Sequence, residues 1–237
     1  MENQQTYVAL LRGINVNGHR VMKMADLRAS LEHHSDSFSH VKTWIQTGNV
    51  IFQSSRNSQE LKEKMKEVIL KDFGLDDVPV MIRTGQEIKE ALANNPFAER
   101  ESKRIFIAFL DQKPRQDLMD EMGRVNYSPE EYVLSEKNDM IYFYIPNFAK
   151  YKLDTTLFEK KLQLKASSRN WRTTTKLAEL ASAMELSEKA ETTDVIAAAG
   201  AASSGTMQRM KRRRQEKVDY NIERLAHGRR SSKRNCG

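Results

Sequence analysis

HVKTWIQTGNVIFQ, residues 40–53, decides the fold of this chain, because it contains two strand-like runs joined by a short break. HVKTWIQ and NVIFQ are rich in β-branched and aromatic residues, which favour strands. Thr47-Gly48 lies between them, and glycine is typical of tight turns. The segment therefore predicts two strands joined by a turn or bulge at residues 47–48.

The residues on both sides of this hairpin alternate between strand and helix patterns. Before it, TYVALLR (6–12) is an apolar run that predicts a buried strand, and MADLRASLEHH (24–34) spaces its apolar residues as one helical face. After it come a second helical stripe at 57–74, the strand VPVMIRT (78–84) and a short helix that Pro96 stops. The predicted order is β-α-β-β-α-β-α.

The same order of elements returns in the second half of the chain. Asp154 is a predicted helix cap, and Pro114 stands at a favoured first helical position. The predicted elements lie at 104–112 (strand), 114–125 (helix), 130–136 (strand), 139–147 (strand), 154–163 (helix), 164–170 (weak strand) and 171–185 (helix).

Each copy matches the split βαβ plan of a ferredoxin-like unit, in which two helices pack on one face of a four-stranded antiparallel sheet. The sequence thus predicts an α+β fold with two ferredoxin-like βαββαβ(α) units in tandem, residues 1–94 and 95–185. A basic, mostly disordered or marginally helical C-terminal tail is predicted over 186–237.

Charge is divided unevenly between the body and the tail. Residues 186–237 hold 12 Lys and Arg against 6 Asp and Glu, which leaves 27 against 26 for residues 1–185. No run approaches the roughly 18 consecutive apolar residues of a transmembrane helix, and Cys236 is the single cysteine. These features predict a soluble, cytoplasmic protein without a membrane partner, with nuclear localisation as an addition if the host is eukaryotic. They imply neither a metal site nor a cofactor.

Three polar segments are the candidates for a binding site: LLRGINVNGHR (10–20), IQTGNVIF (45–52) and SSRNWRTTTKL (167–177). Arg12 offers a planar fork of donors that fits a phosphate or carboxylate, and a helix that begins near Trp171 would add its free N–H groups. The sequence predicts that one cleft between the two units binds a small anionic metabolite or nucleotide. The predicted lining is Arg12, Asn15, Gln46, Asn49, Arg169, Asn170 and Thr173.

A structural interpretation of the same segments stays open. Gly13, Asn17-Gly18 and Gly48-Asn49 are residue types that tolerate positive φ, so they predict turns equally well, and Arg12 could pair with a carboxylate of the body. The segments supply no obvious nucleophile or acid/base pair. Catalytic residues, and whether the chain is an enzyme at all, therefore stay unassigned.

LLRGINVNG, MADLR, IQTGNVIF and RNWRT together resemble the signature stretches of the domain-of-unknown-function 1697 family. This is a group of mostly bacterial proteins without an established activity. The resemblance runs in the right order from residue 6 to about 180, with mild departures at Asn17-Gly18, Trp44 and Thr47. It implies a double α+β architecture and no particular reaction.

The tail supports an alternative function. KRRR (211–214) and GRRSSKR (228–234) are basic clusters of the kind found in nuclear localisation signals and nucleic-acid patches. The alternative hypothesis is weak nucleic-acid binding through phosphate contacts, and a solvated extension is the structural interpretation. The residues assigned to nucleic-acid binding are Lys211, Arg212, Arg213, Arg214, Arg229 and Arg230.

Overall fold

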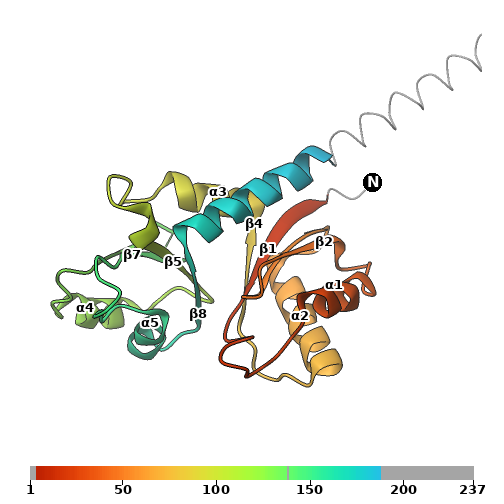
Figure 1. Cartoon of the computed structure of the whole chain (residues 1–237), viewed down its shortest axis with the longest axis horizontal. Helices are drawn as coiled ribbons and strands as arrows, with labels where there is room; N and C mark the ends of the chain where they lie inside the picture. The colour runs from red at the N-terminus through yellow and green to blue at the C-terminus, as the bar shows by residue number, and fades with distance from the viewer. Residues whose placement is uncertain (1–3, 138, 188–237) are drawn as a thin grey trace, which may run out of the picture. The chain divides into compact units, whose positions relative to one another are not determined.

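The computed structural model of the chain describes residues 4–137 and 139–187 (Figure 1). Residues Met1–Glu185 form one compact unit. The predictions for the tail, including its helix and its six basic residues, lie outside the described residues.

The first half of the body has the predicted order of elements. Its strands form one antiparallel sheet in the order β2-β3-β1-β4, which is the ferredoxin-like arrangement. The elements are β1 (Gln5–Leu11), α1 (Met24–Glu32), β2 (Ser39–Trp44), β3 (Asn49–Ser54), α2 (Ser58–Phe73), β4 (Val80–Thr84) and α3 (Gly85–Ala93).

The second half repeats this plan, and its antiparallel sheet has the equivalent order β6-β7-β5-β8. The predicted fold class, with two ferredoxin-like units in tandem, is confirmed. A short 3-10 turn, Ser102–Arg104, leads into this half. The elements are β5 (Ile105–Leu110), α4 (Gln116–Gly123), β6 (Glu131–Leu134), β7 (Met140–Tyr144), α5 (Thr155–Leu162), β8 (Ala166–Asn170) and a last helix over 171–187.

Local capping explains where several helices begin. Asp154 accepts a hydrogen bond from the main-chain N–H of Leu157 at 2.6 Å, as its position predicted. Thr84 and Glu87 form a reciprocal capping box at the start of α3. The prediction for Pro114 was wrong by two residues, because the extended backbone of Arg115 delays the first turn of α4 until Gln116.

The core has three parts, and one of them joins the two sheets. One face of the first sheet packs under α1 and α2, and one face of the second sheet packs under α4 and α5. The remaining faces of both sheets share a third cluster with α3 and helix 171–187. Burying one large aliphatic or aromatic side chain contributes about 1.5 to 3 kcal/mol, so the shared cluster stabilises both halves together. Members of this shared cluster include Val8, Leu10, Ile51, Met81, Ile88, Ile107, Phe109, Tyr142, Leu177 and Met184.

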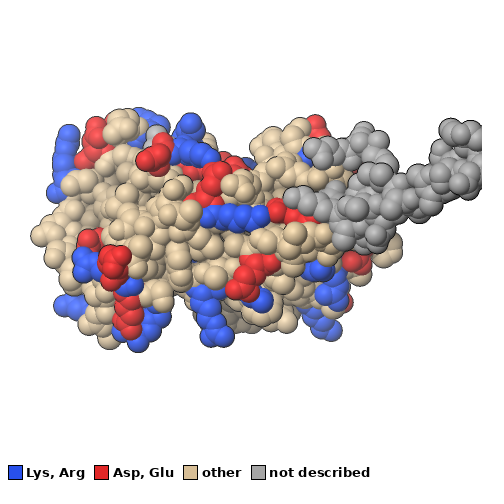
Figure 2. Space-filling model, turned by 90° about the horizontal axis from the view of Figure 1, so that it is seen from above, with Lys and Arg blue, Asp and Glu red and all other residues tan. Residues whose placement is uncertain are grey.

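Helix α3 and helix 171–187 contact each other beside this shared cluster. The Lys89 ammonium lies 2.6 Å from the carboxylate of Glu185, and a Cβ at Gly85 would lie 3.2 Å from that of Ala181. Figure 2 shows that basic and acidic side chains are interspersed on this face of the molecule. In the described part of the chain, no helix is long and apolar enough to cross a bilayer.

Candidate functional site

The turn between β2 and β3 fits tightly against the end of β1. Gly48 has φ +77°, and its carbonyl accepts a hydrogen bond from the N–H of Leu11 at 2.8 Å. A Cβ at Gly48 would lie 2.7 Å from the Cβ of Leu11 and 2.8 Å from Cδ1 of Ile14. Both the backbone conformation and the lack of space therefore require glycine here.

The loop after β1 is a series of left-handed turns, which confirms the structural interpretation of its glycines and asparagines. Gly13, Asn15, Asn17 and Gly18 all have positive φ. The amide of Asn15 donates at 2.8 Å to the carbonyls of Met22 and Gln46, and its oxygen accepts from the N–H of Met22. Asn15 thereby ties the loop to the β2–β3 turn.

Arg169, on β8, is the centre of the predicted site and is buried, with 8% of the residue exposed. Its guanidinium reaches out of the second sheet into the turn of the first. Its donors have six acceptors: the side-chain oxygens of Asn49 and Ser167 and the main-chain carbonyls of Ser168, Leu11, Thr47 and Gly48. These bonds use every N–H direction of the guanidinium, so Arg169 acts as a buried link between the sheets.

No carboxylate is among those acceptors, so carbonyl and hydroxyl dipoles alone compensate the charge of Arg169. Burial and, to a lesser extent, the nearby Arg12 lower the pKa of Arg169 to about 10. The region around Arg12 and Arg169, at the end of β1, is therefore electropositive.

Arg12 pairs with α5, as the structural interpretation predicted. Its Nε and Nη2 lie 3.2 and 2.8 Å from the two oxygens of Glu159, and Nη2 lies 3.4 Å from the hydroxyl of Thr156. The Arg12 side chain is 30% exposed. Among the described residues, none accepts a hydrogen bond from its Nη1, so one nitrogen of the fork keeps free donors.

The other predicted residues have local roles. The oxygen of Asn170 accepts from the N–H of Thr173 at 2.8 Å and so caps helix 171–187, occupying one of the N–H groups that the prediction left for an anion. The side chain of Gln46 is exposed, and the main-chain carbonyl of Gln46 accepts a hydrogen bond from the side-chain amide of Asn15.

The structure therefore brings Arg12, Asn49 and Arg169 close together. Three cavities in the described region have other linings, and none of the seven predicted residues lines any of the three. A ligand-binding role for the seven stays a prediction.

Sequence reasoning missed Arg83 on β4, which repeats the contacts of Arg169 in the opposite direction. Its Nη2 donates to the carbonyls of Leu110 at 2.6 Å and Asp139 at 3.0 Å, both in the second half. Burial lowers the pKa of Arg83. Aligning the two predicted repeats would have found it, because Arg83 and Arg169 both stand two residues before a helix.

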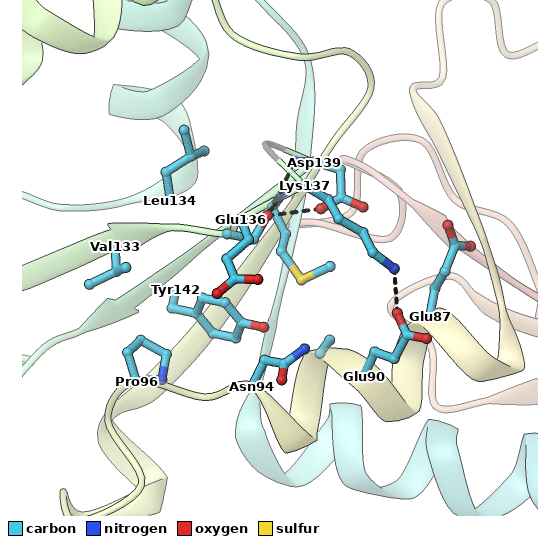
Figure 3. A pocket seen from close by; sticks show the side chains of 13 residues that line it. Glu87, Glu90, Asn94, Pro96, Val133, Leu134, Glu136, Lys137, Asp139 and Tyr142 are labelled. Carbon is cyan, nitrogen blue, oxygen red and sulfur yellow. Dashed lines mark hydrogen bonds and ion pairs between the residues drawn. The ribbon is translucent and has the colours of Figure 1, made fainter.

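Sequence reasoning also missed a cavity of about 230 Å³ between α3 and the β6–β7 hairpin (Figure 3). The charged side chains of its lining are mostly acidic, and its floor is apolar. The hydroxyl of Tyr142 reaches this cavity, and burial together with Asp139 raises its pKa to about 12. The residues that matter for its chemistry are Glu87, Glu90, Asn94, Glu136, Lys137, Asp139 and Tyr142.

The model of a family described as "Protein of unknown function (DUF1697)" matches residues 4–142. The chain belongs to this family. The resemblance found in its sequence motifs is thus confirmed. The family description names no activity.

A solved structure supports the fold of this DUF1697 protein. It is that of the conserved bacterial protein SP0830 from Streptococcus pneumoniae, with a TM-score of 0.58 and 19% sequence identity. The match covers 76% of this chain and 99% of that one. No curated protein matches the sequence significantly.

Proposed function

We propose that this chain binds a small anionic metabolite or nucleotide at Arg12. The observation that carries the proposal is the free Nη1 of Arg12 beside the carboxylate-free Arg169. Glu159 neutralises one of two neighbouring guanidinium charges, so one positive charge is left over.

An anion at Nη1 would gain from both cations. A charge-assisted hydrogen bond to a guanidinium is about twice as strong as one between neutral groups. Arg169 adds long-range attraction without rearrangement, because its neighbours already hold it in place. Phosphates and carboxylates have the oxygen spacing that suits the exposed edge of Arg12.

Thermal unfolding with added inorganic phosphate, nucleotides and dicarboxylates tests the proposal. At ligand concentrations of about 100 times Kd, bound ligand stabilises the fold by about 2.7 kcal/mol and raises Tm. Arg12→Gln is expected to abolish the rise. Arg100→Gln is the matched control, because Arg100 also pairs with one carboxylate, Glu131, and is exposed.

Glu159→Gln supplies the complementary result. It removes the competing carboxylate from Arg12 and leaves the amide in its place, so anions are expected to bind more tightly than to the wild type. A wild-type Tm that no anion class moves, or an unchanged response in Arg12→Gln, would refute the proposal.

The tail carries the second candidate function, nucleic-acid binding, because its Lys and Arg outnumber its Asp and Glu by 12 to 6. If roughly six phosphates are neutralised, the logarithm of affinity for duplex DNA falls with the logarithm of salt with a slope of about −5. The full chain is expected to bind far more tightly than a chain ending at residue 185. Equal binding by the two would assign the activity to the body.

A further inference from the structure

The cavity between α3 and the β6–β7 hairpin has a counterpart in the first half of the molecule. In the first sheet Leu10 pairs with Asn49, which pairs with Trp44. In the second sheet Phe109 pairs with Met140, whose carbonyl accepts from the N–H of Ser135. Trp44 and Ser135 therefore occupy equivalent positions in the two repeats.

These equivalent positions differ greatly in size. The Trp44 indole packs against the shared core cluster beside helix 171–187, with the ammonium of Lys176 at 5.6 Å from its ring centre. At the other position Ser135 is small and its hydroxyl binds Asp139 at 2.8 Å. The second repeat thus lacks the large side chain that fills this position in the first, and the cavity lies there.

The charged residue beside this position also has the opposite sign in the two repeats. Lys176 and Glu90 each lie seven residues after the equivalent arginines, Arg169 and Arg83. A cation therefore faces the indole in one repeat, whereas Glu90 lines the cavity in the other. Glu90 already binds an ammonium group, that of Lys137, whose side chain is 63% exposed.

The hydroxyl of Tyr142 is a second and independent indication of a ligand. Tyr142 is 2% exposed, and within the described residues its hydroxyl has no hydrogen-bond partner. In Figure 3 Tyr142, Glu136 and Asn94 turn their polar ends toward the same space. Because this hydroxyl faces the cavity, it is open to a hydrogen bond from a bound polar group or from water.

We propose that this cavity binds a small organic cation, an alkyl ammonium, with its charged end between Glu136, Glu90 and the Tyr142 hydroxyl. Its hydrocarbon part lies on the apolar floor formed by Ala91 and Met140. The volume of about 230 Å³ is below that of a drug-sized site, so the ligand is short. A bound metal ion fits less well, because the described residues contain no group of three or more His, Cys, Asp or Glu side chains placed to hold one.

NMR titration of the full chain with n-butylammonium and putrescine tests this inference, with n-butanol and butyrate as uncharged and anionic probes at matched ionic strength. Saturable amide shifts are expected within 87–94 and 133–142 for the two amines. Glu136→Gln is expected to weaken amine binding roughly tenfold, since it removes a negative charge, and Tyr142→Phe about fivefold, since it removes a hydroxyl; both keep the shape. Glu179→Gln, which removes an exposed carboxylate paired with Lys176, is the control and leaves binding unchanged.

Two further variants separate this site from others. Lys137→Gln frees Glu90 from its internal ammonium and is expected to strengthen amine binding severalfold. Arg12→Gln leaves amine binding unchanged, so failure of the anion proposal would not affect this result. Equal shifts with n-butanol would indicate an apolar or water-filled cavity and overturn the proposal, as would unchanged amine affinity in both Glu136→Gln and Tyr142→Phe.

Discussion

Arg83 and Arg169 are reciprocal: each donates from its own sheet to the carbonyl of the equivalent leucine in the other. Arg83 Nη2 lies 2.6 Å from the carbonyl oxygen of Leu110, and Arg169 Nη2 lies 2.9 Å from that of Leu11. The strand registers agree, because Arg83 pairs with Val8 and Arg169 with Ile107, each three residues before its leucine. The two sheets are thus joined by a repeated contact between an arginine side chain and a main-chain carbonyl.

Arg83 and Arg169 also share a second type of acceptor, and the two acceptor residues occupy equivalent positions in the two repeats. Gly48 and Asp139 each accept from the N–H of the leucine in their own sheet, and each also accepts from the arginine of the other sheet. A duplicated supersecondary unit explains this arrangement, because the same geometry then serves both directions of the interface.

Replacing Arg169 with methionine is expected to destabilise the fold by roughly 3 to 5 kcal/mol, because the side-chain oxygen of Asn49 and the main-chain carbonyl of Thr47 lose the donor that Arg169 supplies. Urea unfolding measures the free energy of unfolding. Arg100→Gln, which breaks an exposed pair, is expected to cost less than about 1 kcal/mol. Equal losses in the two variants would mean that the buried bonds of Arg169 contribute little.

Gly48→Ala tests the tight turn against β1. Alanine at a left-handed position costs about 1 to 2 kcal/mol, and the clash with Leu11 and Ile14 adds roughly 1 to 3 kcal/mol. Gly18→Ala is the matched control, because Gly18 has φ +76° and no atom within 4 Å of its would-be Cβ. The difference between the urea midpoints of Gly48→Ala and Gly18→Ala measures the cost of the clash alone. Similar midpoints would show that the turn can move away from Leu11 and Ile14.

The fold could be predicted from the sequence because its signals are local. Alternation and helical spacing identify each element, and the repeated order identifies the ferredoxin-like plan. The start of α4 was missed because a proline is compatible both with a first helical position and with the extended residues before one.

The site could be predicted only in part, because residue type does not reveal a partner. The segments that contain Arg12, Asn49 and Arg169 meet in the structure, yet the donors of Arg169 bind carbonyls of the opposite sheet. One of these carbonyls belongs to Gly48, which lies 121 residues from Arg169 along the chain. The cavity at Tyr142 depends on the absence of a large side chain at Ser135. That absence is visible in the sequence only after the strands of the two repeats are aligned.

Ionisation of Tyr142 is expected to make the free energy of unfolding depend on pH in the alkaline range. Its pKa is about 12 in the fold, against about 10 in an unfolded chain, so the unfolded state loses its proton first as the pH rises. The free energy of unfolding is therefore expected to fall between about pH 10 and pH 12. Tyr142→Phe cannot ionise and should show a shallower fall over this window in urea unfolding series. An identical pH profile for both proteins would mean that other groups govern the loss.

Cutting the chain at the predicted boundary tests whether residues 1–94 fold alone. In this fragment Val8, Leu10, Ile51 and Met81 lose their partners from the second sheet and face water. The fragment is expected to lack a cooperative urea transition and to bind a hydrophobic dye, whereas residues 1–187 keep both sheets and unfold cooperatively. A sharp transition with ordered side-chain signals in the fragment would show instead that each ferredoxin-like unit is a domain in its own right and that the shared cluster only docks them.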